Sequence, residues 1–504
     1  MTDVEEFDQY HVTTWKECVD LCRRTGLSDK YLPCSSLWST FMIRPVLALA
    51  LAFALTMTIE SGRCLADEDA KKQMTLSRGK KWLRANPFWI GALTQNDDIF
   101  DVNDYKGAGM THLLAWDPKP NMLRQSSDDG LPIHYHLHQN HGETPEQYVE
   151  HTRALMEQYP GITGVMFWDE PRIYVMPRVR DTLIALRKAF PDKLIYSNAL
   201  PRGARWPAKY GFDNDNHPPD FYDTYIERFG QIVEPDVVMI DIYPLGKGGG
   251  KSGIYFENMA LVRREGMKLN APYWVFIQSF DHDGRRRRPS DSDIRFQMFA
   301  PMAMGYTGFA YFTYDPALGP GLVDGAARRT PLYYHSGRAN MEVANLGQAL
   351  RFLDNTGVAF VLGRQERDGK GVPNPAPRMP KGKWTWPDVE GRSALLTDVT
   401  IDAVGPDRDA MLGFFRDDDG HEYLMVTNIW HDEGMTGADC AQTFTLRFDP
   451  KVTSLTRLSR ETGRPEALVV EGGVLKLRLP GGTGDLFKLG DAPFPGLDEQ
   501  STDR

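Results

Sequence analysis

Two adjacent acidic residues, Asp169 and Glu170, are the strongest candidates for chemistry in this chain. They follow an apolar run that ends at Trp168, and Pro171 comes directly after them. A carboxylic acid beside a second carboxyl group can protonate a leaving oxygen while its partner stabilises or attacks the developing positive centre, as glycosidic bond hydrolysis requires. An aromatic neighbour and a second negative charge would raise the pKa of Glu170 toward neutrality. The structural alternative is an acid pair that only caps the helix expected from residue 175.

Other polar and aromatic residues follow further apolar runs. Asp241 ends one run and could supply a second carboxylate, either as a nucleophile or as the base for a water. Arg285 opens a run of four arginines, whose guanidinium groups would match the oxygens of a sulfated or uronic sugar. The alternative for that run is a solvated loop. The other candidates for substrate binding are Trp168, His138, Tyr243, Gln278 and Tyr314.

Eight apolar runs alternate with amphipathic segments, and this order predicts the scaffold that positions these residues. The predicted strands cover residues 88–94, 110–116, 133–138, 162–168, 193–198, 236–243, 273–280 and 308–314. The predicted helices cover residues 145–159, 175–190, 221–233, 256–269, 291–304 and 335–353. Strands that alternate with helices imply a parallel sheet. Eight such units in about 265 residues match a (β/α)8 TIM barrel, whose active site lies at the carboxyl ends of the strands.

A doubly wound open sheet is the alternative to the barrel. It would be favoured by Gly-x-Gly-x-x-Gly after the first strand, and residues 91–94 do not supply that motif. In a barrel, Asp169 and Glu170 can share one site only if the strand that carries them is irregular at its end. Successive side chains on a strand point to opposite faces, so these two share a site only if the strand has lost its regular pleat by that point.

The pattern changes after the predicted barrel. We expect the barrel over residues 86–360 and a linker rich in proline and glycine over 361–389. Short alternating strands with tight turns follow, one turn being Asp417 to Gly420. They predict a C-terminal β-sandwich over residues 390–492.

The first 66 residues have a separate character. Residues 42–66 have the build of a secretory signal peptide, with Arg44, an unbroken apolar run over 46–55 and small residues at positions 64 and 66. Ten apolar residues are too few to span a bilayer, so we expect no stable membrane anchor. Because a signal peptide belongs at the start of a chain, we interpret residues 1–41 as an upstream misreading. A genuine N-terminal extension is the alternative.

Composition narrows the class of protein further. The net charge is −10, which disfavours a nucleic-acid partner, since phosphate binding draws on a basic surface. One of the five cysteines, Cys440, lies beyond residue 66, so the mature chain has no internal disulfide. We therefore expect an exported bacterial protein, periplasmic or extracellular. The sequence implies no cofactor, and no metal site is expected, although His134, His136 and His138 alternate along one strand as metal ligands can.

Glu170-Pro171 after the fourth predicted strand resembles the acid/base signature of the large (β/α)8 clan of glycoside hydrolases. Asp241-Ile242-Tyr243-Pro244, the run from Arg295 to Ala300 and the segment from Gly305 to Phe312 add partial matches. With the C-terminal sandwich, the layout resembles β-galactosidase-like bacterial glycosidases over most of residues 86–490. The resemblance implies a secreted hydrolase of an oligo- or polysaccharide, with Glu170 as general acid/base.

This chain departs from the clan at the seventh strand, where the clan carries its nucleophilic glutamate and this chain has Gln278. Three accounts remain open. Asp169 and Glu170 resemble the pair of glycoside hydrolase families 20 and 123, in which the substrate's 2-acetamido oxygen attacks, the aspartate orients it and the glutamate is the acid. In the second account Asp241 is the second carboxylate. In the third the protein binds sugar on a TIM-barrel scaffold without cleaving it.

Overall fold

The computed structural model of the protein describes residues 76–497, with gaps at 141, 204–205, 249–250, 283, 364–381, 403–407 and 491–492. The predicted signal peptide at 42–66, the predicted misreading at 1–41 and most of the predicted linker lie outside the described residues. Among the described helices, none combines the length and the apolar character that crossing a membrane requires.

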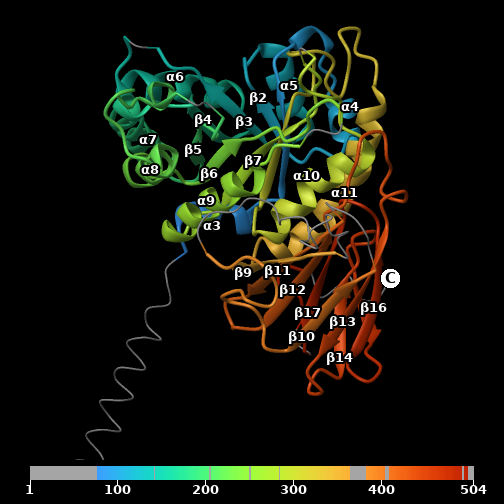
Figure 1. The fold of residues 1–504 in the computed structure, drawn as a ribbon. Helices are drawn as coiled ribbons and strands as arrows, with labels where there is room; N and C mark the ends of the chain where they lie inside the picture. The colour runs from blue at the N-terminus through green and yellow to red at the C-terminus, as the bar shows by residue number, and fades with distance from the viewer. Residues whose placement is uncertain are drawn as a thin grey trace, which may run out of the picture. The chain divides into compact units, whose positions relative to one another are not determined.

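Eight parallel strands close into a barrel in sequential order, as the sequence predicted (Figure 1). They are β1 (Trp89–Thr94), β2 (Leu113–Ala115), β3 (Ile133–Leu137), β4 (Ile162–Asp169), β5 (Leu194–Ala199), β6 (Val238–Asp241), β7 (Tyr273–Gln278) and β8 (Gly308–Phe312). β1 pairs with both β2 and β8, so the sheet has no free edge.

Nine α-helices are described, and all six predicted helices are present within a few residues. They are α3 (Arg78–Ala85), α4 (Val102–Gly107), α5 (Pro120–Asp129), α6 (Pro145–Gln158), α7 (Met176–Ala189), α8 (Phe221–Arg228), α9 (Tyr255–Lys268), α10 (Asp291–Ala303) and α11 (Pro331–Leu350). Local sequence sets several starts: Thr144 and Gln147 form a capping box before α6, and Ser290 and Asp293 form another before α10. Because α4 is only 6 residues long, its periodicity was too short to predict.

Large aromatic side chains fill the barrel interior. Trp89 and Trp274 stack with ring centroids 4.5 Å apart, and the His134 ring lies against both. Trp82 of α3 packs against the same cluster and covers its lower end. A side chain at Gly164 would meet the His134 ring at 2.6 Å, so glycine there is what allows a histidine inside the barrel.

The C-terminal region forms two antiparallel sheets, in agreement with the predicted sandwich. The larger sheet has the order β15-β14-β17-β12-β11-β9 and the smaller one β10-β13-β16. The strands are β9 (Asp354–Val361), β10 (Leu396–Ile401), β11 (Ala410–Arg416), β12 (Glu422–Asn428), β13 (Gln442–Phe448), β14 (Ser454–Leu458), β15 (Pro465–Val469), β16 (Val474–Leu479) and β17 (Gly484–Leu489).

β9 moves the start of the second region ahead of the predicted boundary at residue 360. It pairs with β11, so the larger sheet begins at Asp354, directly after α11. Its side chains alternate between two cores: Val358 and Phe360 pack with the barrel and its helices, whereas Ala359 and Val361 pack inside the sandwich. One face of the larger sheet therefore packs on the barrel.

Candidate active site

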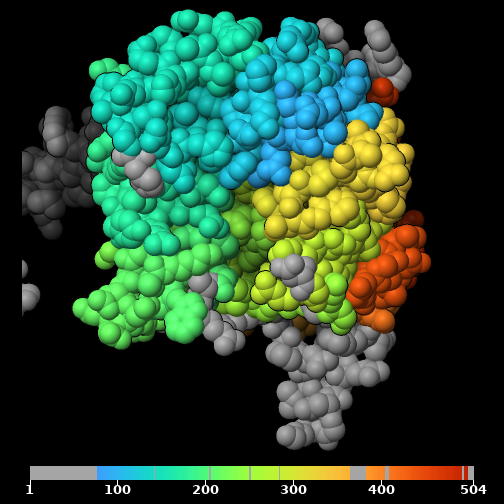
Figure 2. All heavy atoms as spheres, turned by 90° about the horizontal axis from the view of Figure 1, so that it is seen from above, coloured from blue at the N-terminus to red at the C-terminus, as the bar shows by residue number. Residues whose placement is uncertain are grey.

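The carboxyl ends of the barrel strands and the loops that follow them form one face of the protein. Figure 2 looks onto this face, and the segments follow one another in chain order around a hollow, from blue through teal and green to yellow. Asp169, Glu170 and Asp241 all lie at strand ends on this face. This is where a TIM barrel carries its chemistry.

A bulge at the end of β4 gives Asp169 and Glu170 their positions. Met166 pairs with Tyr196 and Asp169 with Asn198, so β4 takes three steps where β5 takes two. Trp168 and Glu170 adopt left-handed backbone conformations, with φ of 60° and 52°. The strand has thus lost its regular pleat at this point. Asp169 and Glu170 are therefore not forced to point to opposite faces, and both can serve one site.

Strand β5 holds this bulge in place from the neighbouring position. The Ser197 hydroxyl donates to the carbonyl of Trp168 at 2.7 Å, and the backbone N–H of Glu170 donates to the carbonyl of Asn198 at 2.9 Å. A non-glycine residue in the left-handed region costs about 1–3 kcal/mol. Two such residues in a row of three indicate that the surrounding structure enforces the positions of these carboxyl groups.

Three carboxyl groups meet around Asn198. Its side-chain Nδ2 donates to Oδ1 of Asp169 at 3.0 Å and to Oδ1 of Asp241 at 3.3 Å. Hydrogen bonding between the Glu170 and Asp241 carboxyl groups lowers the pKa of Glu170 and raises the pKa of Asp241. The arrangement therefore gathers three interacting acidic groups around one amide.

All three carboxyl groups have raised pKa values. Burial, and after it the charge of Glu170, raises the pKa of Asp169 from 3.8 to about 7. Burial also raises the pKa of Glu170, with the positive charge of Lys209 acting in the opposite direction. The pKa of Asp241 lies well above its ordinary value because of burial and the charges of Glu170 and Asp169. Such values suit groups that exchange protons near neutral pH.

Aromatic residues line the face beside the carboxyl groups. Tyr243 follows β6 and packs edge-on against Phe280 with ring centroids 5.0 Å apart, and Phe312 lies 5.6 Å from Tyr243. His138 is exposed at the end of β3, where its Nε2 lies 2.8 Å from the carbonyl oxygen of Trp116. The structure thus brings the predicted Tyr243 and His138 to the same face as the carboxyl groups.

Three predicted substrate-binding residues have side chains that are buried and do not open onto this face. Trp168 is buried, at 5% exposed, with the Arg178 guanidinium 5.8 Å above its ring, because the bulge turns its side chain into the outer packing. Tyr314 is also buried and packs edge-on against Tyr105 in the layer between strands and helices. Neither ring is available as a stacking surface for a sugar.

Gln278 is the third, and its side chain serves the protein itself. It is fully buried, its Oε1 accepts from the backbone N–H of Leu245, and its Nε2 donates to the carbonyls of Leu245, Phe280 and Arg287. These bonds occupy the amide and join the loops that follow β6 and β7. Gln278 is therefore a positioning residue and not a contact for substrate.

Asn198 and Lys209 were not among the predicted site residues. Asn198 is a neutral amide inside an apolar run, and nothing in its type indicated that it would bridge two carboxyl groups. Lys209 lies in a short 3-10 helix, Pro207–Tyr210, within the loop that follows β5. Its place on the catalytic face of a barrel was the available signal.

The histidines of β3 lie among aromatic rings. His134 is buried, with Nδ1 3.1 Å from the Tyr196 hydroxyl, and His136 is stacked on Trp116 at 4.0 Å. Burial lowers the pKa of His136 to about 3, so it is neutral. Within the residues that the structure describes, the one group of three side chains spaced for a metal ion lies in the β11–β12 turn: Asp417, Asp419 and His421.

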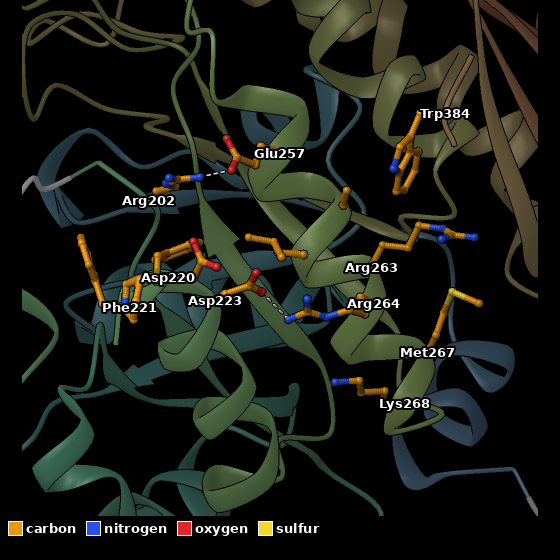
Figure 3. Close-up of a pocket in the computed structure, with 14 residues that line it drawn as sticks. Arg202, Asp220, Phe221, Asp223, Glu257, Arg263, Arg264, Met267, Lys268 and Trp384 are labelled. Atoms are coloured by element: carbon orange, nitrogen blue, oxygen red, sulfur yellow. Dashed lines mark hydrogen bonds and ion pairs between the residues drawn. The ribbon is translucent and has the colours of Figure 1, made fainter. Parts of the chain in front are cut away.

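A separate cavity of about 830 Å³ lies on the outer side of the barrel, along α8 and α9 (Figure 3). Its charged side chains form pairs across it, Arg202 with Glu257 and Arg264 with Asp223 at 2.7 Å. It lies beside two helices, away from the strand ends, and is distinct from the carboxyl cluster.

No family model matches the chain, and a search of curated proteins finds no similar sequence. A search of solved structures does find matches. One is titled a glycoside hydrolase, with 13% identity, a TM-score of 0.48 and coverage of 81% of this chain and 94% of that one. Another is a glycoside hydrolase of family 5 from Bacteroides vulgatus, also with 13% identity and a TM-score of 0.48, covering 82% and 91%.

A β-galactosidase from Marinomonas is a further structural match, with 11% identity and a TM-score of 0.40. This chain covers 63% of that protein's length, which is less than two thirds, and 55% of its own. At these identities and TM-scores the likeness assigns neither an activity nor a substrate to this chain.

Proposed function

We propose that this protein is a glycoside hydrolase and that Glu170 is its general acid/base. The observation that carries the proposal is the cluster of three carboxyl groups with raised pKa values at the carboxyl ends of β4 and β6. Gathering three acids in one partly buried site costs free energy, because each charge there is desolvated. Acid–base catalysis near neutral pH does need such groups.

The hydrogen bond between Glu170 and Asp241 supports Asp241 as the second catalytic carboxyl group. Carboxyl pairs in retaining glycosidases stand about 5–5.5 Å apart, and those in inverting enzymes stand farther apart. Substrate binding must therefore break this hydrogen bond, with the glycosidic oxygen taking the proton from Glu170 and Asp241 left as the carboxylate. Asp169 influences Asp241 in two ways: it accepts a hydrogen bond from the Asn198 amide that also bonds Asp241, and its charge raises the pKa of Asp241.

Turnover of a panel of aryl glycosides tests the proposal, with pairs that differ only in a 2-acetamido group. We expect Glu170→Gln to lower kcat by about 10²–10⁴-fold on substrates with poor leaving groups, while sugar binding measured by calorimetry survives. Aryl leaving groups of low pKa need less protonation, so the loss should shrink with them. Glu146→Gln, exposed on α6, is the matched control. Full activity of Glu170→Gln on every substrate would refute the central role.

A second pair of variants separates Asp241 from Asp169. If Asp241 is the nucleophile, Asp241→Ala should lose activity and regain part of it with azide, giving a glycosyl azide. If the 2-acetamido group attacks instead, the wild type should cleave only N-acetylated substrates. In that case azide should not rescue Asp241→Ala, and Asp169→Asn should show the larger loss.

We also propose that the protein is exported. The predicted signal peptide supports this, and N-terminal sequencing of the natural protein is the test. A mature chain that begins near Asp67 is expected. A terminus before residue 42 would contradict both the signal peptide and the interpretation of residues 1–41.

A further inference from the structure

The four arginines after β7 differ in what their side chains contact. The Arg287 guanidinium is buried and pairs with both carboxylate oxygens of Asp293, one of them at 2.8 Å. Arg288 donates to the backbone carbonyls of Pro320 and Gly321, the latter at 2.9 Å. Arg285 is exposed to solvent. Arg286 is half-buried, and its guanidinium forms no hydrogen bond or ion pair with the residues that the structure describes.

The backbone around Arg286 is fixed from both sides. Arg286 forms β-bridges with Gly246, in the loop after β6, and with His282. The backbone N–H of Lys247 donates to the carbonyl of Arg285 at 3.1 Å. The buried Gln278 amide holds the carbonyl of Arg287 at 2.8 Å, one residue further on. Hydrogen bonds between the loop after β6 and the loop after β7 therefore fix the backbone of Arg286.

Arg286 and the carboxyl cluster both act electrostatically on Tyr243. Burial, and after it the negative charges of Asp241, Asp169 and Glu170, raise the pKa of the Tyr243 hydroxyl, and the positive charge of Arg286 lowers it. Tyr243 thus lies within electrostatic range of both. Burial, and then the charge of Arg285, lowers the pKa of Arg286 itself. Among the described residues no carboxylate pairs with this half-buried cation, and a bound anion would offset its desolvation cost.

We infer that Arg286, with Tyr243 beside it, forms a subsite for an anionic substituent on the sugar that the carboxyl cluster cleaves. A planar guanidinium binds two oxygens of a carboxylate or of a sulfate ester at once, so either group fits this chemistry. The inference deepens the proposed function and rests on it. It identifies the substrate as a uronic or sulfated glycan, and it places recognition on Arg286 and not on the exposed Arg285.

Matched substrate pairs test the subsite. Aryl glucosides and galactosides are compared with the corresponding glucuronides and galacturonides, and aryl N-acetylglucosaminide and galactoside with their 6-sulfates. The wild type should cleave the anionic member of one pair with the higher kcat/KM. Arg286→Gln should lower that kcat/KM by about 10- to 100-fold, the value of a charged hydrogen bond, and leave the neutral member unchanged. Arg286→Lys keeps the positive charge but lacks the planar set of N–H donors, so it should recover part of the lost kcat/KM.

The two kinds of pair distinguish a carboxylate from a sulfate. Arg328→Gln is the control, because Arg328 is 80% exposed in the loop after β8 and pairs with Asp324. Preference for the neutral member, or an equal loss on both members in Arg286→Gln, would overturn the anion subsite and leave the hydrolase proposal standing. If no glycoside is cleaved, the hydrolase proposal fails. Calorimetry with glucuronate and a sulfated disaccharide then decides the subsite, and binding that does not depend on Arg286 overturns it.

Discussion

Replacing Asp169 by asparagine should stabilise this protein, and the gain should increase with pH. Burial and the Glu170 charge raise the pKa of Asp169 to about 7, so the folded state resists ionising a group that the unfolded chain ionises near 3.8. The free energy of unfolding of the wild type therefore falls as pH rises from the unfolded pKa to the folded pKa, and it levels off above that. Asparagine has nearly the same shape, keeps an acceptor for Asn198 and carries no charge.

The gain in the free energy of unfolding follows from the difference of about 3 between the folded and unfolded pKa values of Asp169. Each difference of 1 in pKa corresponds to about 1.4 kcal/mol. Above pH 7 the full difference applies, and Asp169→Asn should be more stable than the wild type by about 4 kcal/mol. At pH 5 the folded carboxyl is still protonated while the unfolded one is largely ionised, so the gain should be about 1.5 kcal/mol.

Urea unfolding at pH 5 and pH 8, followed by fluorescence and by circular dichroism, measures this difference. Asp181→Asn, an exposed position on α7, serves as the control and should show no trend with pH. Asp169→Asn should also lose activity, because residues that serve a catalytic site are often kept at a cost in stability. A destabilised Asp169→Asn, or a gain that is the same at both pH values, would refute the raised pKa of Asp169.

Three further outcomes are expected. Lys209→Gln should shift the alkaline limb of the kcat/KM profile to higher pH, because the Lys209 charge lowers the pKa of Glu170; an unmoved limb would contradict this. Gln278→Glu should not supply a nucleophile but should lower the free energy of unfolding by about 3–5 kcal/mol in urea titrations, since a buried carboxylate would face three carbonyl oxygens. Asp293→Ala leaves the Arg287 guanidinium buried without its partner and should cost a similar amount, about 3–5 kcal/mol, by the same measurement.

The barrel could be predicted from sequence because its strands are buried on both faces and appear as continuous apolar runs. β9 could not be predicted in this way. It follows α11 with Asp354, Asn355, Thr356 and Gly357, a polar beginning that is typical of a loop. Its partner β11 begins at Ala410, so pairing across a long insertion, which no local pattern encodes, decides that it is a strand.

The part of the site that could be predicted from sequence consists of residues whose type by itself indicates acid–base chemistry. Asp169, Glu170 and Asp241 stood out as acids at strand ends, and the structure brings them together. The choice among the four consecutive arginines depends on the register between two loops, which the sequence does not reveal: Arg285 was the predicted contact, and Arg286 is the residue that the bridges to Gly246 and His282 hold in place. Trp168 was expected at the mouth because the sequence does not reveal the left-handed turn of the bulge that buries its ring.

The bulge explains how adjacent acids can serve one site. In a regular strand, Asp169 and Glu170 would point to opposite faces, one into the barrel and one into the helix layer. The extra residue in β4 and the positive φ of Trp168 and Glu170 remove that constraint. Backbone strain of this kind persists only where neighbouring bonds enforce it, and Ser197 and Asn198 supply those bonds from β5. Because Asn198 also bridges Asp169 and Asp241, one strand both holds the strained turn and aligns the carboxyl groups that the turn delivers.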